Sequence, residues 1–124
     1  MVRRPLNTAV VQGSSVTLHC SSDDSSAILL WYNSLCLTNK NVAQCTGDLV
    51  YSGYSVQHSP SRFRVFNESE GVDATQVTRD LNINPTQLND AGVFLCAERR
   101  FAVASVQTSS AQLIVLGNFM GIFY

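Results

Sequence analysis

The chain has 124 residues and a formal net charge of -1, which suits a single domain with its own core. A charge so close to zero provides no broad positive field for nucleic acid or for an acidic membrane surface. Charged residues make up 14% of the chain, below the usual share of about a quarter. Ser, Thr, Asn and Gln must therefore supply much of the polar surface, as is common in extracellular β domains.

The first half of the chain predicts short strands separated by polar turns. Val16, Leu18 and Cys20 alternate with polar residues, which is the period of two of a half-buried strand. Ile28–Asn33 is apolar on both faces, as in a central strand. The expected strands of this half are 9–13, 15–21, 28–33 and 49–51, with polar loops or turns at 21–26, 34–47 and 52–54.

The second half continues the pattern and closes the domain. Its expected strands are 62–66, 76–83, 92–98 and 111–115, with loops at 67–74, 84–88 and 99–107. Short strands at regular spacing without a helical period predict an all-β fold, a two-sheet antiparallel Greek-key sandwich. We expect one domain over residues 1–117, followed by a short aromatic tail over 118–124.

The cysteines and the ends of the chain indicate a secreted environment. Four cysteines is an even number, none lies in a Cys-x-x-Cys pair, and none has a histidine at zinc-finger spacing. Two disulfides and an oxidising compartment are the better interpretation. Pro5-Leu6-Asn7 interrupts any secretory signal, and the apolar runs 27–32 and 113–116 are too short to span a bilayer. We expect a mature or excised extracellular fragment without membrane insertion, with Met1 as an expression start.

Three features together resemble the V-set of the immunoglobulin superfamily. They are Cys20, Trp31 eleven residues later, and Cys96 preceded by Asp90-x-Gly92-x-Phe94. The resemblance covers about residues 5 to 116. It implies a Cys20–Cys96 disulfide between two sheets, with Trp31 packed against it. It also implies an ion pair of Arg62 with Asp90, extra edge strands between Leu49 and Arg62, and a core that includes Leu18, Trp31, Phe94 and Leu113.

Three departures mark this chain as a divergent member. Phe94 stands where the family has its corner tyrosine, and Thr108-Ser109-Ser110 stands near the place of the Phe/Trp-Gly-x-Gly motif of antigen-receptor final strands. Cys36 and Cys45 are extra, and their placement resembles the second disulfide of polymeric-immunoglobulin-receptor-like and related innate receptors. A local disulfide would pin the long connection; a redox role would need a cation beside the thiol, for which Lys40 is the only candidate. These features would suit an innate or invertebrate-chordate receptor.

The sequence offers no chemistry for catalysis. His19 and His58 are single histidines, whereas a metal site needs three or four convergent ligands. No Gly-rich phosphate loop or nucleophile motif is present. We therefore predict no enzyme, no catalytic residue, no metal site and no cofactor. Asn67-Glu68-Ser69 is a glycosylation sequon in an expected loop.

Strand parity predicts an apolar surface on the outside of the sandwich. If Trp31 and Phe94 point inward, their immediate neighbours point outward. In the V-set these outward positions share one sheet face, which V domains use for pairing. A contiguous apolar patch of this kind marks an interface; alternatively, an edge hairpin or the tail 119–124 covers it in the monomer. The expected partner face consists of Leu30, Tyr32, Tyr51, Val93, Leu95 and Ile114.

The loops at one end of the sandwich form a second expected surface. Arginine and aromatic residues dominate interface energies, and Ser and Tyr suit adaptable binding loops. The alternative is an ordinary solvated hairpin tip. The expected ligand residues are Asp24, Tyr54, Glu98, Arg99, Arg100 and Phe101. Arg79 shares the parity of Val77 and Leu81, which predicts that it points inward.

The sequence thus favours a non-catalytic recognition module of a secreted or cell-surface immune-type receptor. It would bind a protein ligand with its end loops and pair with another V domain, as a homodimer in isolation, through its sheet face. One alternative is a cell-adhesion domain that makes homophilic contacts through that face. Another is an accessory V domain of a soluble carbohydrate-binding, chitin-binding-like effector.

Overall fold

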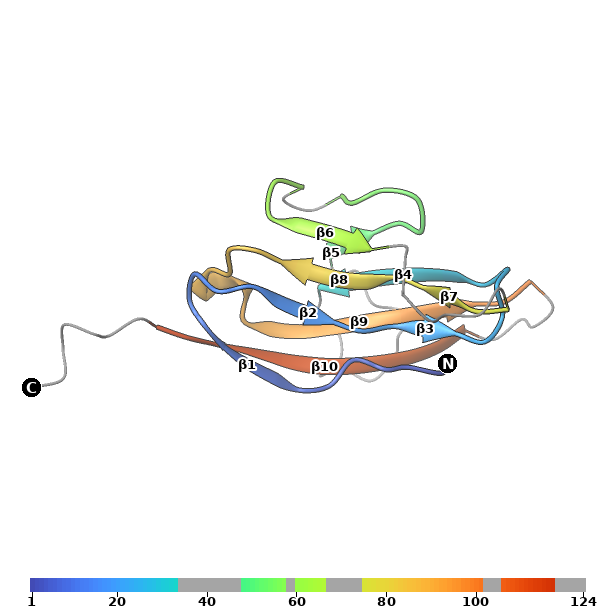
Figure 1. Cartoon of the computed structure of the whole chain (residues 1–124), viewed down its shortest axis with the longest axis horizontal. Coiled ribbons are helices and arrows are strands. Elements are labelled where there is room, and N and C mark those ends of the chain that lie inside the picture. Colours follow the sequence, from blue (N-terminus) through green and yellow to red (C-terminus); the bar gives the residue numbers. More distant parts are fainter. Residues whose placement is uncertain (34–47, 58–59, 67–74, 102–105, 118–124) are drawn as a thin grey trace, which may run out of the picture.

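A computed structural model of the chain describes residues 1–33, 48–57, 60–66, 75–101 and 106–117 (Figure 1). Apart from one 3-10 turn, η3 (Leu88–Asp90), every regular element within these residues is a β-strand. The strands are β1 (Thr8–Val11), β2 (Val16–Leu18), β3 (Ser21–Ser22), β4 (Ile28–Asn33), β5 (Asp48–Tyr51), β6 (Phe63–Phe66), β7 (Val77–Thr78), β8 (Asp80–Ile83), β9 (Gly92–Arg99) and β10 (Val106–Leu116).

The strands form a sandwich of sheets. One sheet has the order β1-β10-β9-β4-β5, and the opposing layer contains β2-β8-β6 and the short pair β3-β7. All pairs are antiparallel except β1 with β10, which run parallel. The predicted all-β antiparallel sandwich is therefore confirmed, although sequence periodicity did not indicate the parallel edge strand.

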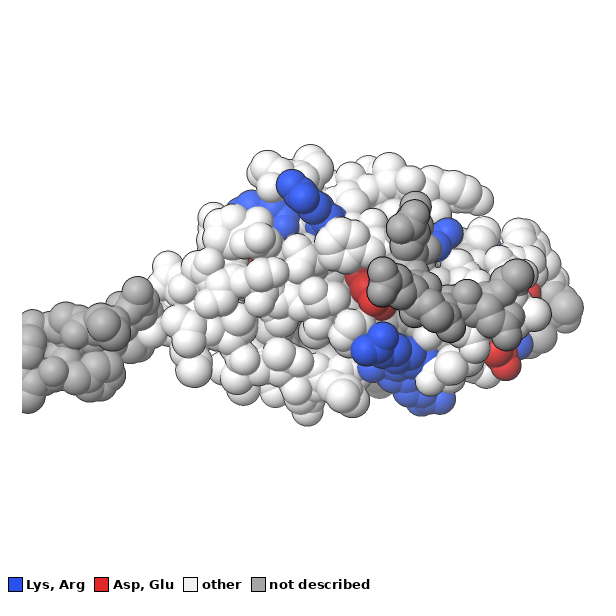
Figure 2. All heavy atoms as spheres, in the orientation of Figure 1, with Lys and Arg blue, Asp and Glu red and all other residues white. Residues whose placement is uncertain are grey.

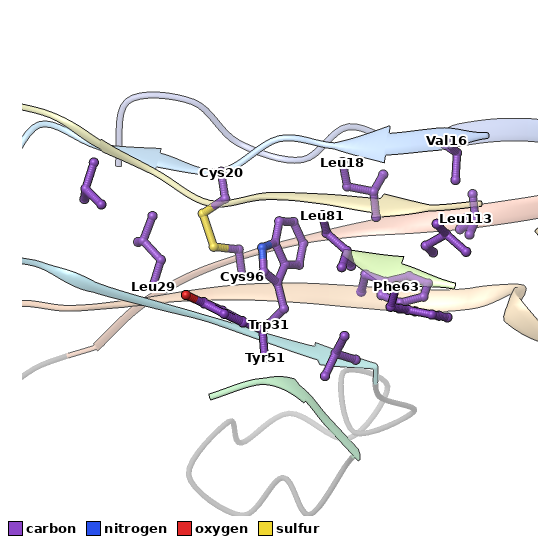
Figure 3. Packing of buried hydrophobic residues seen from close by; sticks show 14 of the residues in the cluster. Val16, Leu18, Cys20, Leu29, Trp31, Tyr51, Phe63, Leu81, Cys96 and Leu113 are labelled. Carbon is purple, nitrogen blue, oxygen red and sulfur yellow. A yellow bond between two sulfur atoms is a disulfide. The ribbon is translucent and has the colours of Figure 1, made fainter. Parts of the chain in front are cut away.

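The core lies between the layers, around a disulfide and a tryptophan (Figure 3). Cys20 and Cys96 are bonded, with their Cα atoms 6.5 Å apart, and this link contributes roughly 4 kcal/mol on a chain-entropy model. Trp31 is fully buried beside it, and its Nε1 donates a hydrogen bond to the carbonyl of Arg79 at 2.7 Å. The expected core residues Leu18, Phe94 and Leu113 are also buried.

The end of the sandwich opposite the β9–β10 connection is closed by an ion pair. Arg62 Nη1 and Nη2 donate to Asp90 at 2.7 and 3.0 Å, and Asp90 also accepts a hydrogen bond from the amide of Gln87. The hydrogen bond with Asp90 raises the pKa of Arg62 above its already high value. The pairing expected from the sequence is therefore present, and Asp90 also fixes the turn before β9.

The strand expected at 76–83 is divided at Arg79, but its register with the facing strand continues across this residue. β7 ends at Thr78 and β8 starts at Asp80. The pairs Ser21–Thr78 and Leu18–Leu81 belong to one register, so the parity that predicted an inward Arg79 is unchanged. Arg79 uses its amide to reach the carbonyl of Cys20 at 2.9 Å. Its side chain is partly exposed and donates to the carbonyl of Thr78.

The final strand is longer than predicted. β10 starts at Val106, within the expected loop, and pairs with β9 without interruption from Val106–Arg99 to Leu113–Gly92. The register shows no irregularity along Thr108–Ser110, which fits the absence of the Gly-x-Gly motif from this stretch. The pairing with β9 decides where this strand starts, and that pairing is a long-range interaction that local composition does not reveal.

Candidate recognition surfaces

The strand register places Leu30, Tyr32 and Leu95 on the outer side of the sheet, as parity predicted, but two of these side chains are buried. Leu30 pairs with Ala97 and Tyr32 with Leu95, on the side of the sheet opposite Trp31 and Cys96. However, Leu30 is 8% and Leu95 2% exposed. The prediction of an open apolar patch centred on them is wrong. Alternation determines which face a side chain is on, but not what other parts of the chain cover that face.

Tyr51 does not belong to the outer face. The register of β4 against β5 shifts between Trp31 and Tyr32, so Tyr51 pairs with Trp31 and lies on the same side. It is 6% exposed and belongs to the core cluster. This expected partner residue is therefore a core residue, because an irregularity in the pairing reversed the side on which it lies.

The exposed apolar part of the outer sheet face lies along β1 and the end of β10. Tyr32 and Val93 are half-buried, whereas Ile114 is 45% exposed. Val11 and Leu116 are paired across the two strands and have similar exposures, 47% and 50%. Sequence reasoning found Ile114 but missed Val11 and Leu116, because nothing local predicted a parallel strand beside β10.

Contacts at the other end of the sandwich bring three segments together. Ile28, at the start of β4, pairs with Arg99 and lies against Gly53 of the turn after β5. Gly53 has φ +94°, and a Cβ there would come within 2.6 Å of the Ile28 side chain, so glycine allows this close approach. Arg100 reaches Asp23 in the loop before β4. In Figure 1 the loop after β3 and the end of β9 lie at the end away from the C-terminus.

Glu98 supports this end from inside rather than contacting solvent. It is 1% exposed, and its carboxylate lies 3.2 Å from Arg100 Nε and 3.6 Å from the amino group of Met1. Burial raises the pKa of Glu98, but hydrogen bonds from Ser22 and Arg100 outweigh burial, so the pKa lies below its usual value. The prediction that Glu98 is a ligand-contacting loop residue is wrong, since the residue shares the inward parity of Cys96.

Arg100 and Asp24 make hydrogen bonds and ion pairs to neighbouring residues at this end of the sandwich. Arg100 bridges Glu98 and Asp23, and its hydrogen bonds to these carboxylates raise its pKa. Asp24 accepts hydrogen bonds from the amide and hydroxyl of Ser26, which lower its pKa. The sequence singled out Asp24, whereas the inter-loop contact uses its neighbour Asp23. Aspartates in a polar loop cannot be ranked without knowing where Arg100 lies.

Three expected ligand residues remain open to solvent at this end. Tyr54 is 82% and Phe101 79% exposed, and Arg99 is exposed. Exposed aromatic side chains with an arginine close by can bury apolar area and form charge-assisted hydrogen bonds with a partner. We call Tyr54, Arg99 and Phe101 the end-loop surface.

The remaining residues named from the sequence are the two histidines, the second cysteine pair and the glycosylation sequon. His19 is paired, with Nδ1 3.0 Å from Asp80 Oδ2. Within the part of the chain that the structure describes, no three His, Cys, Asp or Glu side chains gather as metal ligands, and no helix is long and apolar enough to cross a membrane. The expected Cys36–Cys45 pair and the sequon at Asn67 lie outside the described residues, as does His58.

The visible charge is distributed in small groups. Figure 2 shows a mostly uncharged face on which a few separate clusters of basic and acidic side chains lie. This distribution agrees with the near-zero net charge. Any partner specificity on this face must therefore come from local contacts rather than from a broad electrostatic field.

Comparison with known proteins identifies the fold class. No protein-family model and no curated protein matches the chain. Two solved complexes of titin M10 with an obscurin-like 1 immunoglobulin domain contain similar chains. For a mutant complex the identity is 19% over 94% of this chain and 91% of that chain, with a TM-score of 0.60. For the complex in space group P1 the values are 18%, 94%, 92% and 0.58.

The chain therefore has an immunoglobulin-like fold. This fold often mediates protein–protein recognition, and the similar chains come from complexes between immunoglobulin domains. In total 1541 solved chains match, so the fold is too widely shared to specify a function. The function has to be argued from the surfaces of this particular chain.

Proposed function

We propose that the chain is a V-type immunoglobulin domain that recognises a protein ligand through its end-loop surface, without catalysis. Support for the V-type comes from the segment after β5. Tyr51 forms an antiparallel bridge with Val56, and the amide of Gln57 donates to the carbonyl of Val50 at 2.7 Å. This isolated bridge lies beside β5, at the edge where V-type domains have additional strands.

The observation that carries the proposal is that ion pairs of Arg100 hold the segment next to the exposed Phe101 in place. Arg100 ties the segment after β9 to the loop before β4, while Phe101 next to it remains 79% exposed. A loop already held by ion pairs loses less conformational entropy when a partner binds. A large apolar side chain held open in this way suits a binding contact better than a solvated hairpin tip does.

The biological setting completes the proposal. The Cys20–Cys96 disulfide suits an oxidising, extracellular compartment, so we place the domain in a secreted or cell-surface immune-type receptor. Within it, Cys36 and Cys45 form a second disulfide and Asn67 carries a glycan. The residues assigned to ligand contact are Tyr54, Arg99 and Phe101.

The test is a binding screen against arrayed recombinant cell-surface and secreted ectodomains, with chitin beads and a glycan array in parallel. A protein hit is expected. Phe101→Ala and Tyr54→Ala should each weaken it about 30-fold, which corresponds to a contact worth about 2 kcal/mol. The matched control is Leu88→Ala, because Leu88 is 50% exposed at the opposite end.

Three outcomes would contradict the proposal. Unchanged affinity of Phe101→Ala and Tyr54→Ala would move the site away from the end loops. An equal loss with Leu88→Ala would show a general effect on the fold. A hit only on chitin or glycans would favour the carbohydrate-binding alternative.

A second candidate function is cell adhesion through the outer sheet face. β1, β4 and β10 contain no charged residue, and interface cores are depleted of charge. The shielding of Leu30 and Leu95 weakens this candidate. Bead aggregation by the immobilised domain tests it: adhesion requires aggregates that Gln112→Lys, on the exposed outer face, abolishes, and dispersed beads reject it.

A further inference from the structure

Among the residues that the structure describes, no strand pairs with the outer edge of β1. β1 is at one margin of the five-stranded sheet (Figure 1). Proteins usually protect such edges with charged side chains, proline or bulges, because unpaired backbone groups there attract other strands. β1 reads Thr8-Ala9-Val10-Val11, and no charged residue occurs anywhere between Pro5 and Leu18. The edge therefore lacks the charge that would repel a second strand.

Alternation of the backbone identifies the groups on this edge. The amide of Gln12 donates to the carbonyl of Leu116 in β10 at 2.7 Å, so Gln12, Val10 and Thr8 turn their backbone groups toward β10. Ala9 and Val11 turn theirs away. The Val11 carbonyl already accepts hydrogen bonds from the amide of Ser14 and the hydroxyl of Thr86. The amide and carbonyl of Ala9 and the amide of Val11 remain directed at the open edge.

Apolar side chains flank the same edge. Ala9 pairs with Ile114, and Val11 pairs with Leu116, so all four are on the outer face of the sheet. Ala9 is exposed, and the three larger side chains are 45–50% exposed. A strand added beside β1 would cover part of this apolar strip as well as satisfying the backbone groups.

We propose that this edge pairs with the same edge of a second copy of the chain. The two β1 strands run antiparallel about a twofold axis at Ala9, and the two five-stranded sheets become one continuous sheet. The two Ala9 residues then exchange a pair of backbone hydrogen bonds, and Asn7 of each copy is opposite Val11 of the other.

The edge fits a second copy because its open groups are self-complementary about Ala9. Ala9 presents one donor and one acceptor, which are the groups that its symmetry mate requires. Neither copy brings a charge to the contact, so no like-charge repulsion opposes it. Thr86 keeps the Val11 carbonyl occupied, which limits the pairing to a short ribbon. The contact is independent of the end-loop surface, so either proposal can fail alone.

The first experiment is sedimentation equilibrium of the chain from about 10 μM to 1 mM, which covers dissociation constants from the micromolar to the millimolar range. We expect a monomer–dimer equilibrium. Val11→Lys puts a charge on the edge and should weaken dimerisation at least about tenfold. Ala9→Pro removes the amide donor on the open side and should do the same. The matched control is Ser110→Lys, which adds the same charge to the exposed outer face of β10 away from β1 and should leave the dimer unchanged.

Hydrogen exchange provides a readout that does not depend on any substitution. The amide of Ala9 should become protected as concentration rises, whereas the amide of Val10, which faces β10, should be protected at every concentration. A monomer throughout the concentration range overturns the proposal. So does a dimer that Ser110→Lys disrupts and Val11→Lys does not, because pairing would then use the sheet face rather than its edge. If Ala9→Pro unfolds by circular dichroism, Val11→Lys and the exchange of Ala9 decide the question.

Discussion

Substituting Leu95 tests whether the outer sheet face is covered within the chain. Leu95 is 2% exposed although it is on the side of β9 opposite the core. Truncating a leucine buried to this extent costs about 2–5 kcal/mol. Because Leu95 lies outside the main core cluster, we expect Leu95→Ala to be in the lower half of that range, about 2–3 kcal/mol. At about 4 °C per kcal/mol for a domain of this size, the melting temperature should fall by about 8–12 °C.

The matched control for Leu95 is Ile114→Ala on the same face. Ile114 is 45% exposed, so its truncation should cost about 1 kcal/mol or less. Urea unfolding of both variants, followed by tryptophan fluorescence, measures the difference, and Trp31 is the only tryptophan. Equal losses for the two variants would refute the argument, because Leu95 would then be no better covered than Ile114. Leu95→Glu should unfold the domain, since it buries an unpaired charge.

Two further predictions concern charged groups. Asp90→Ala should destabilise the domain by about 3–5 kcal/mol in urea because it leaves Arg62 without its buried partner, while Asn89→Ala next to it stays near wild type; similar values for both would contradict the role of the pair. The folded pKa of Glu98 lies below its usual value, so Glu98 stabilises the fold above its unfolded pKa of about 4.3, and this contribution is lost as the pH falls through the lower folded pKa. Urea midpoints measured from pH 7 to pH 3 should fall more steeply for wild type than for Glu98→Gln, and parallel curves would reject this assignment.

The fold was predictable to the extent that its signals are local. The alternation around Leu18 and Cys20 and the spacing to Trp31 indicated strands, a core and a disulfide that the structure contains. The contacts of the Arg79 backbone were not predictable, because its carbonyl accepts a hydrogen bond from the distant Trp31 side chain. The inward orientation of Tyr51 was not predictable either, because a register shift between two strands produces it.

The candidate sites show the same division. The sequence identified Phe101 and Tyr54, since exposed aromatics in polar loops stand out without any structure. It grouped Glu98 with them, although strand pairing carries Glu98 into the interior as the support of Arg100. It also missed the edge around Ala9, because an exposed strand edge exists only once the neighbouring strands are known.

The sequence alone determined the all-β class, the inward positions of Trp31, Phe94 and Cys96, and the loops that carry exposed aromatic residues. These properties follow from alternation, spacing and residue type, which are encoded within a few residues. Only the tertiary structure decided that Leu95 is covered, that Arg100 bridges two loops, and that β1 joins the sheet in parallel and leaves its edge open. Each of these depends on which distant segments meet, and no local pattern specifies that.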